Sequence, residues 1–514
     1  MTVVQTSHGP VRGTTTLTRR ADVESYLGIP FAAPPVGALR FRPPQPPEAW
    51  TTEREVKRFA PAAPQNPDPV LAAGGFWQPP HDEAECLNLN VWTPSADDRA
   101  RPVLVWIHGG AYVSGSNSTG YNNGAELAAA LDVVVVSINY RLGVFGFLYL
   151  EHLLGAEFAD SGNLAVLDQI AALHWVRDNI RAFGGDPSKV TIFGESAGAA
   201  AVGTLLGTPL AQGLFTRAIM QSGTAERARE VEESVAVTAE FLDAAGVTAS
   251  DAETLLRMST ADLLAAQAVV AAAHAERTIG LPLPFMPTID GRVLAQSPLD
   301  AIADGVGSDV DLLAGTNLNE ASFFIVARAD ADETRTSDEK LRALIAEDFA
   351  DPAAVRADYV AALSVELGRE PSDDEVLESY LSDRLYRQPT TRLLDARQAA
   401  SGRTFAYLFT WASPLMDGAL GSCHALDVPF VFRQLDRLES ASLVGPNPPV
   451  ELSEWMSGAW VEFARRGAPN SPALPDWPQY LSEGRLTMEL SPRPRVLSDP
   501  RETLRRFWRA EVTA

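Results

Sequence analysis

The sequence predicts an α/β fold in which a central, mostly parallel sheet is flanked by helices. Four short apolar runs have the length and the β-branched content that are typical of buried strands. Between the second and third runs, apolar residues recur at helical spacing and stop before the glycine pair at 184–185, as expected of a crossover helix. The four runs are residues 103–107, 133–138, 190–193 and 310–314.

The chain is expected to form one domain over residues 1–514, although it is longer than an average domain. Hydrophobic residues make up 46% of the sequence, which supports a large core. Two stretches, at about 226–300 and 330–401, are rich in alanine or charged residues and are predicted to be helical cap insertions. The proline-rich segment 61–80 is predicted to be a loop over the entrance of a site.

A pentapeptide of the form G-x-S-x-G occupies residues 194–198 and directly follows one of the apolar runs. A sharp turn between a buried strand and a helix strains the serine backbone and exposes its Oγ, and the glycines let strand and helix approach closely. Because short strings of this form also arise by chance, the strand–turn–helix context carries the interpretation. Ser196 is therefore the predicted nucleophile, and a packing serine in a glycine-rich turn is the alternative.

A glycine pair, Gly109 and Gly110, follows the apolar run that ends at residue 107. Glycine lets the backbone bend so that consecutive N–H groups point at one spot, where they can bind the negative oxygen of a tetrahedral intermediate. The N–H of Ala197, the residue after the predicted nucleophile, would complete such an oxyanion site. An ordinary loop is the alternative for a glycine pair on its own.

A nucleophilic serine needs a base and an acid, and candidates for both follow Ser196 in the chain. Of the seven histidines, His424 lies in a loop that follows a late strand-like run. Glu320 lies at the tip of a turn after another such run. The order serine, glutamate, histidine is that of α/β-hydrolases and differs from that of chymotrypsin and subtilisin. Asp427, close to His424 in sequence, is the chief competitor for the role of the acid.

The chain resembles the type-B carboxylesterases, the cholinesterase-like branch of the α/β-hydrolases, and is most similar to the bacterial para-nitrobenzyl esterase type. The shared motifs occur in one order over nearly the whole chain, which makes the resemblance specific. They are GPVRG (9–13), LGIPFA (27–32), PPVG (34–37), RFRPP (40–44), CLNLNV (86–91), NYRLG (139–143), DQ (168–169), WV (175–176), FGGDP (183–187), QSG (221–223), FAR (463–465) and GAPN (467–470).

The resemblance implies an α/β-hydrolase fold and a serine carboxylesterase that cleaves small-molecule esters through an acyl-enzyme, with broad specificity for neutral apolar esters. The same machinery would serve a carbamate, amide or lactone hydrolase, so these alternatives stay open. A non-catalytic cholinesterase-like binding module is the alternative from another class, and it would lack the nucleophile. The implied site residues are the triad Ser196, Glu320 and His424 and the oxyanion donors Gly110, Ala111 and Ala197.

Two further residues are expected to lie near the substrate. Trp77 belongs to a stretch that resembles the aromatic-Trp-x-Pro segment with which cholinesterases bind a quaternary ammonium, and loop packing is the alternative. Glu195 is expected to add negative potential beside the nucleophile, or else to satisfy local hydrogen bonds. Similar proteins also form an ion pair at the position of Arg40, but the usual acidic partner is replaced here by Ala84.

Composition limits the partners of the protein. A net charge of −24 argues against nucleic acid, and the sequence carries no metal-binding or phosphate-loop motif, so no metal or other cofactor is expected. No apolar run approaches the roughly 18–20 residues of a membrane span. The first residues lack the features of a signal peptide, and two cysteines, Cys86 and Cys423, are too few for a disulfide framework. A cytoplasmic protein is therefore expected, either monomer or dimer.

Overall fold

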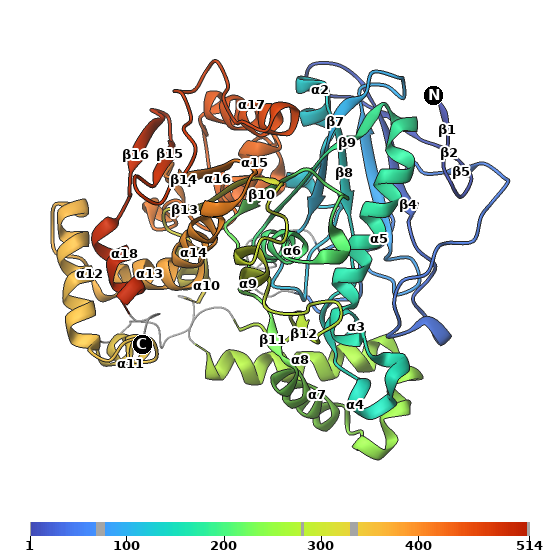
Figure 1. The fold of residues 1–514 in the computed structure, drawn as a ribbon, viewed down its shortest axis with the longest axis horizontal. Helices are drawn as coiled ribbons and strands as arrows, with labels where there is room; N and C mark the ends of the chain where they lie inside the picture. Colours follow the sequence, from blue (N-terminus) through green and yellow to red (C-terminus); the bar gives the residue numbers. More distant parts are fainter. Residues whose placement is uncertain (1, 68–77, 279–281, 329–337, 511–514) are drawn as a thin grey trace.

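The computed structural model of the protein describes residues 2–67, 78–278, 282–328 and 338–510. Trp77, predicted to lie near the site entrance, falls outside these residues. The described chain is built around one large sheet with helices on both faces (Figure 1). This architecture agrees with the predicted α/β class.

The central sheet has eleven strands within the described ranges. They are β3 (Thr14–Thr16), β4 (Val23–Pro30), β6 (Asn88–Thr93), β7 (Arg101–Ile107), β8 (Val134–Ile138), β9 (Gly185–Glu195), β10 (Arg217–Gln221), β13 (Asp311–Asn317), β14 (Thr404–Phe409), β15 (Leu486–Leu490) and β16 (Arg495–Ser498). Their order is β16-β15-β14-β13-β10-β9-β7-β8-β6-β4-β3. Pairing is parallel from β8 to β15 and antiparallel toward both edges.

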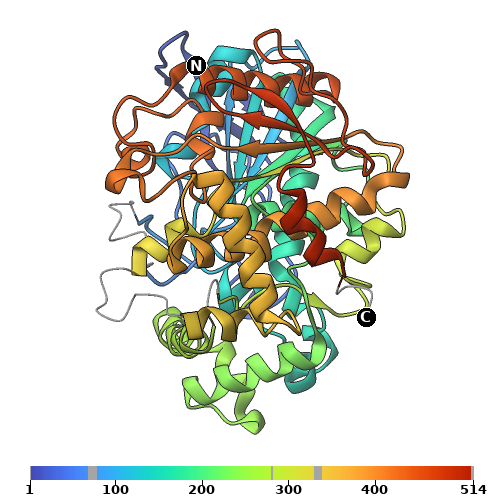
Figure 2. The same cartoon turned by 90° about the vertical axis from the view of Figure 1, so that its left-hand side faces the viewer.

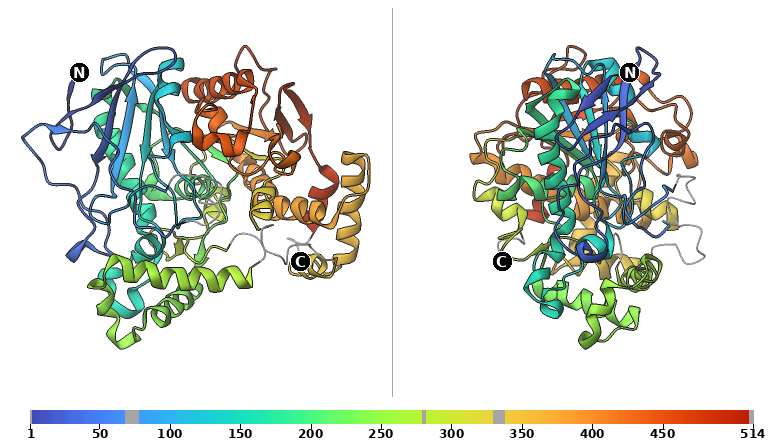
Figure 3. Two further views of the ribbon diagram at one scale, coloured as in Figure 1. Left: turned by 180° about the vertical axis from the view of Figure 1, so that it is seen from behind. Right: turned by 90° about the vertical axis from the view of Figure 1, so that its right-hand side faces the viewer.

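The N-terminal strands and the C-terminal hairpin β15–β16 lie at opposite ends of the molecule (Figures 1 and 3). Two small sheets accompany the central one. They are β1 (Val3–Gln5), β2 (Pro10–Arg12) and β5 (Arg54–Glu55), and, separately, β11 (Arg229–Glu230) with β12 (Thr288–Ile289).

Both faces of the central sheet are buried, as the side chains of β7 illustrate. Val103, Val105 and Ile107 pack in one hydrophobic cluster, whereas Leu104 and Trp106 pack in another. Successive side chains of a strand point to opposite faces, so a continuous apolar run suits a sheet that is covered on both sides. The first cluster includes α5 (Leu164–Asn179) and α6 (Ala197–Leu206), and the second includes α2 (Ala125–Leu131), α15 (Val428–Val431) and α17 (Val450–Arg466).

All four predicted apolar runs coincide with strands, namely β7, β8, β9 and β13, although β8 and β13 begin one residue later than predicted. The predicted crossover helix is α5, and a single 3-10 turn, η5 (Ile180–Phe183), extends it. Gly184, with φ of 83°, ends this turn in the left-handed region that glycine adopts readily. Strand β9 begins at Gly185, earlier than predicted, because this residue still pairs with Arg101 across a register shift.

Two helical segments separate strands that are neighbours in the sheet. Between β10 and β13 lie α7 (Val231–Ala245), η7 (Ala249–Leu256), α8 (Thr260–Arg277) and α9 (Pro298–Ala303). Between β13 and β14 lie α10 (Ser322–Arg328), α11 (Asp338–Ile345), α12 (Pro352–Leu367), α13 (Asp373–Ser382), η8 (Asp383–Arg387) and α14 (Gln388–Ala396). Helices α11 to α13 share a separate hydrophobic cluster with the C-terminal helix α18 (Glu502–Ala510), and they lie in front of the sheet in Figure 2.

The expectation that Arg40 lacks its ion-pair partner is wrong. Its guanidinium binds Glu83, with Nη2 at 2.6 Å from Oε2, and donates to the carbonyl of Met258 at 2.6 Å. Glu83 stands one position further upstream than the expected acid, and the local turn brings its carboxylate to the same place. The pair therefore ties the loop before β6 to the segment before α8.

Candidate active site

Ser196 lies at the sharp turn between the end of β9 and the start of α6. Its backbone has φ of 58° and ψ of −124°, a conformation that is unfavourable for a residue with a Cβ. The surrounding structure holds it there, since its N–H donates to the carbonyl of Gln221 on β10 at 3.0 Å. The strand, turn and helix thus form the strained elbow that the pentapeptide predicts.

The two glycines of the pentapeptide are required by close backbone contacts. A Cβ added at Gly198 would lie 2.1 Å from the carbonyl oxygen of Ile107. A Cβ added at Gly194 would lie 2.5 Å from the carbonyl carbon of Gly198. Backbone atoms cannot move aside as a flexible side chain can, so larger residues at these positions would push the helix away from the strand.

The loop after β7 lies against the serine. A Cβ added at Gly109 would lie 3.1 Å from the Cβ of Ser196. Gly110 and Ala111 have φ of 115° and 53°, and no described residue accepts a hydrogen bond from either N–H group. Ala197 is the first residue of α6, where a backbone N–H has no partner within the helix. These three N–H groups are therefore free donors beside Ser196.

His424 and Glu320 come from loops after the neighbouring parallel strands β14 and β13, and their side chains meet. His424 Nδ1 lies 2.7 Å from Glu320 Oε2, and Glu320 Oε1 accepts the N–H of Asn317 at 2.7 Å. Glu320 is fully buried and His424 is 6% exposed. The carboxylate can thus hold the imidazole in one orientation and stabilise its cationic form.

Glu195 occupies the other side of the imidazole. Its Oε1 lies 3.0 Å from His424 Nε2, and no hydrogen bond joins Nε2 to the hydroxyl of Ser196. Burial by itself lowers the pKa of His424, but the neighbouring Tyr386, Glu195 and Glu320 outweigh it and hold the pKa well above its ordinary value. This geometry suits an imidazolium between two carboxylates, and substrate-free catalytic hydrogen bonds are often incomplete in this way.

Asp427, the competitor for the acid, does not contact His424 through a hydrogen bond. Its carboxylate accepts from Gln221 Nε2 at 2.9 Å and from the hydroxyl of Tyr407 at 3.0 Å. Burial, reinforced by the negative charge of Glu195, raises the pKa of Asp427 to about 7. Of the two candidate acids, Glu320 and not Asp427 therefore contacts the imidazole, at Nδ1.

Two aromatic rings pack beside His424 that were not predicted from the sequence to lie near the site. The ring centroids of Tyr386 and Phe324 lie 4.6 Å and 5.4 Å from that of His424. Tyr386 belongs to η8 and Phe324 to α10, both in the second helical segment. Nothing in the local pattern of these helices distinguishes a ring that faces the site from one that packs the core.

A small cavity of about 20 Å³ is lined in part by Ser196. Its walls come from the loop after β7, the start of α6, the loop after β10, the segment before β12 and the end of η8. The lining residues are Ala111, Tyr112, Ser196, Ala197, Ala200, Ser222, Gly223, Thr224, Arg227, Leu283, Leu385 and Tyr386.

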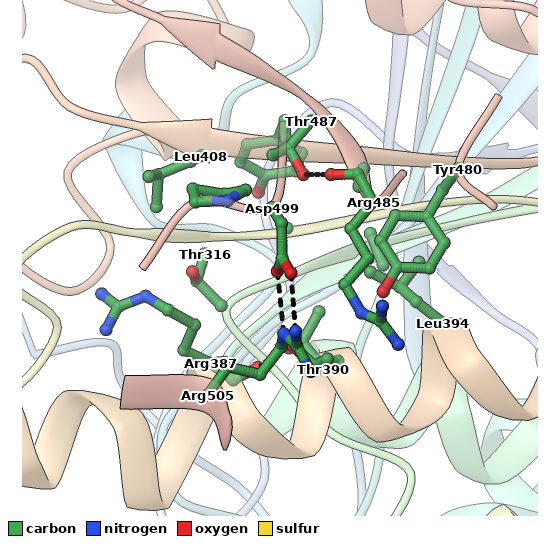
Figure 4. A pocket seen from close by; sticks show the side chains of 16 residues that line it. Thr316, Arg387, Thr390, Leu394, Leu408, Tyr480, Arg485, Thr487, Asp499 and Arg505 are labelled. Atoms are coloured by element: carbon green, nitrogen blue, oxygen red, sulfur yellow. Dashed lines mark hydrogen bonds and ion pairs between the residues drawn. The ribbon is translucent and has the colours of Figure 1, made fainter. Parts of the chain in front are cut away.

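A second cavity, of about 50 Å³, lies apart from Ser196 between β13, β14 and α14 (Figure 4). Three arginines line it, and each already has a carboxylate partner. Figure 4 shows the guanidinium of Arg505 facing Asp499 in the middle of the cavity. The pairs are Arg505–Asp499 (2.6 Å), Arg485–Asp395 (2.9 Å) and Arg387–Asp383. Arg485 and Arg505 thus fix the C-terminal segment, whereas Arg387 pairs within its own helix.

Within the described ranges, no cluster of three or more histidine, cysteine or acidic side chains could hold a metal ion. Over the same ranges, no helix is both long and apolar enough to cross a membrane. Both cysteines are buried and free. Burial raises the pKa of the Cys423 thiol to about 12, so this neighbour of His424 is not an activated nucleophile.

The fold and the elbow serine beside a histidine–glutamate pair define the class of α/β-hydrolases. A profile described as "Carboxylesterase family" matches residues 1–508. The para-nitrobenzyl esterase of Bacillus subtilis (strain 168) is 37% identical over 499 residues, which cover 97% of this chain and 96% of that protein. The phenmedipham hydrolase of Pseudarthrobacter oxydans is 35% identical and 89% of each chain is covered.

Solved structures agree with the sequence relatives. The carboxylesterase of Geobacillus stearothermophilus superposes with a TM-score of 0.85 at 37% identity, covering 99% of this chain and 100% of that one. A PNB esterase structure superposes with a TM-score of 0.84 at 34% identity, with 98% of each chain covered. The chain belongs to the carboxylesterase family. It is a carboxylic ester hydrolase that acts on small-molecule esters.

Proposed function

We propose that this esterase works through Ser196 as nucleophile, His424 as base and Glu320 as the acid that orients it. The observation that carries the proposal is the 2.7 Å contact between His424 and Glu320 beside a serine in a strained elbow. Strain and burial of this kind persist where the surroundings hold a reactive group in place. The distribution of the three residues over separate loops suits catalysis better than packing.

His424 removes the proton from Ser196, which attacks the ester carbonyl. The free N–H groups of Gly110, Ala111 and Ala197 receive the negative oxygen of the tetrahedral intermediate. His424 then protonates the departing alcohol, and water repeats the sequence on the acyl-enzyme. For attack His424 must be neutral, so the Nε2 proton shared with Glu195 first leaves to that carboxylate or to solvent, and Nε2 then turns to the serine hydroxyl.

The alanine and leucine side chains of the cavity beside Ser196 suit neutral apolar esters. Carbamates, amides and lactones form the same kind of tetrahedral intermediate and are candidate substrates of the same triad. The two helical segments between β10 and β14 would cap a single α/β domain. We also place the protein in the cytoplasm, since its two buried cysteines are unpaired.

Ser196→Ala tests the proposal. The variant is expected to lose on the order of 10⁵–10⁶-fold in kcat for a 4-nitrophenyl ester, by analogy with removal of a protease serine. A phosphonate reagent should label Ser196 in the wild type and leave the variant unmodified, as peptide mass spectrometry would report. A variant that keeps more than a few per cent of the activity would refute the nucleophile.

A further inference from the structure

An arginine without a carboxylate partner lines the catalytic cavity. Arg227 belongs to the loop after β10 and borders the same cavity as Ser196. Its guanidinium donates one hydrogen bond to a described residue, from Nη2 to the carbonyl of Leu385 at 3.3 Å. Among the described residues, no carboxylate lies within 4.0 Å of its guanidinium. The adjacent Glu226 does not neutralise it, because Glu226 pairs with Arg392 at 2.6 Å.

Two hydroxyl groups in the walls of this cavity also lack partners. The hydroxyls of Ser222 and Tyr386 are buried and form no hydrogen bond with any described residue. Buried polar groups are nearly always hydrogen-bonded, and an unsatisfied one costs about 1–3 kcal/mol. Two such groups around one cavity next to the nucleophile indicate that a polar ligand group completes them.

A second arginine stands behind the cavity wall. Arg229 donates from Nη2 to the carbonyl of Leu283, a lining residue, and its buried Nε has no described partner. Like Arg227, it is bound to a backbone carbonyl and forms no ion pair with a described carboxylate. Residues 227–229 thus bring two arginines without a described ion-pair partner to one side of the cavity, although the whole chain carries a net charge of −24.

The donors and acceptors of this wall do not balance. Arginine offers five N–H donors and accepts none, and each hydroxyl can donate one hydrogen bond. A carboxylate has the complementary character, because its two oxygens accept about four hydrogen bonds and guanidinium binds it in a fixed geometry. The three arginines of the second cavity show the contrast, since each of them has an aspartate partner.

We propose that the catalytic cavity is selective for esters that carry a second, free carboxylate, which Arg227 binds while Ser196 attacks the ester carbonyl. The proposal rests on the proposed function and adds a preferred substrate class to the neutral esters, namely half-esters of short dicarboxylic acids and other esters with a free carboxylate. Hydrolysis adds one water across the ester bond, so monoethyl glutarate would yield glutarate and ethanol. The free carboxylate is unchanged in the reaction and serves recognition alone.

The test compares matched esters with and without the charge, in the wild type and in Arg227→Gln. Monoethyl glutarate and ethyl pentanoate differ on the acyl side, and the butanoate ester of glycolate and propyl butanoate differ on the alcohol side. Arg227→Gln is expected to lower kcat/KM for the charged member of one pair by about 10–100-fold, as loss of a hydrogen-bonded charge does. The neutral members should change little. The pair that responds shows on which side the carboxylate lies.

Two further variants separate recognition from folding and from net charge. Arg227→Lys keeps the charge and should restore most of the selectivity. Arg181→Gln removes the same charge from an exposed residue that precedes β9, at the opposite end of the strand from Ser196, and should leave every ester unaffected. Thermal unfolding of each variant confirms that it is folded.

An equal loss of kcat/KM for charged and neutral esters in Arg227→Gln would overturn the proposal. The role of Arg227 would then be structural, through its hydrogen bond to the Leu385 carbonyl. A wild type that shows no preference for either charged ester would overturn it as well. Failure of the proposed function is distinguishable, because it would abolish the role of Ser196 toward the neutral esters too.

Discussion

Glu320→Gln is expected to keep the fold and to lower kcat by several powers of ten. The substitution keeps the size of the side chain, and its carbonyl oxygen can still accept the N–H of Asn317, which now lies 2.7 Å from Glu320 Oε1. What it removes is the negative charge at 2.7 Å from His424 Nδ1. A neutral amide favours the wrong imidazole tautomer and no longer stabilises the imidazolium that forms during attack.

The expected loss of activity is estimated for both candidate acids, Glu320 and Asp427. An aspartate-to-asparagine change at the equivalent place in a serine protease costs about 10⁴-fold, which corresponds to about 5 kcal/mol of transition-state stabilisation. Asp427→Asn should cost less than about 10-fold. Burial raises the pKa of Asp427 to about 7, which weakens its negative charge at neutral pH, and it binds Gln221 and Tyr407 in place of His424.

The assay is kcat for a short-chain 4-nitrophenyl ester, measured for both variants at pH 7 and at pH 8.5. Thermal unfolding shows whether each variant is folded, and phosphonate labelling reports the intrinsic reactivity of Ser196. If Asp427→Asn is the more damaging of two folded variants, Glu320 is not the acid. If kcat falls by the same large factor in both variants, the carboxylates of Glu195, Glu320 and Asp427 act as one unit, and Glu320 cannot be assigned as the acid by itself.

Two more predictions concern pH. Glu195→Gln should move the acidic limb of the pH profile of kcat/KM to lower pH. The substitution removes a negative charge 3.0 Å from His424 Nε2 and so lowers the pKa of a base that must be unprotonated to act. An acidic limb at the same pH in both proteins would contradict this prediction. Asp427→Asn should flatten the pH dependence of thermal stability. In the wild type, burial raises the pKa of Asp427 from 3.8 to about 7, so between these values the native state binds more protons than the unfolded chain and stability falls as pH rises. A Tm that declines equally in both proteins from pH 5 to pH 8 would exclude the contribution of Asp427.

Local patterns in the sequence were sufficient to predict the strands and the elbow. An apolar run that continues without alternation indicates a strand buried on both faces, and β7, β8, β9 and β13 occupy the predicted places. The pentapeptide around Ser196 is local as a sequence pattern, and Gly194 meets Gly198 within it, but the carbonyl of Ile107 on β7 is what requires glycine at position 198. The apolar runs and the pentapeptide can be recognised from neighbours a few residues away, and the sequence therefore contains them.

Contacts between loops were decided by the tertiary structure. The sequence left Glu320 and Asp427 as two candidates for the acid. Only the adjacency of β13 and β14 brings the Glu320 carboxylate to Nδ1 of His424. The ion pair of Arg40 also depends on tertiary structure. Glu83 replaces the expected partner because the local turn, and not the position in the sequence, places its carboxylate beside Arg40.

The cavity beside the serine is the least local feature of all. Tyr386 and Arg227 come from segments about 160 residues apart. Neither lies in a sequence motif that would predict a place in the wall of the cavity. Their surroundings are set by the strand order and by how the helical segments pack over the sheet. A chain's local periodicity specifies which elements form, whereas the partners of a buried charge or hydroxyl depend on which elements meet, and that is a property of the packed molecule.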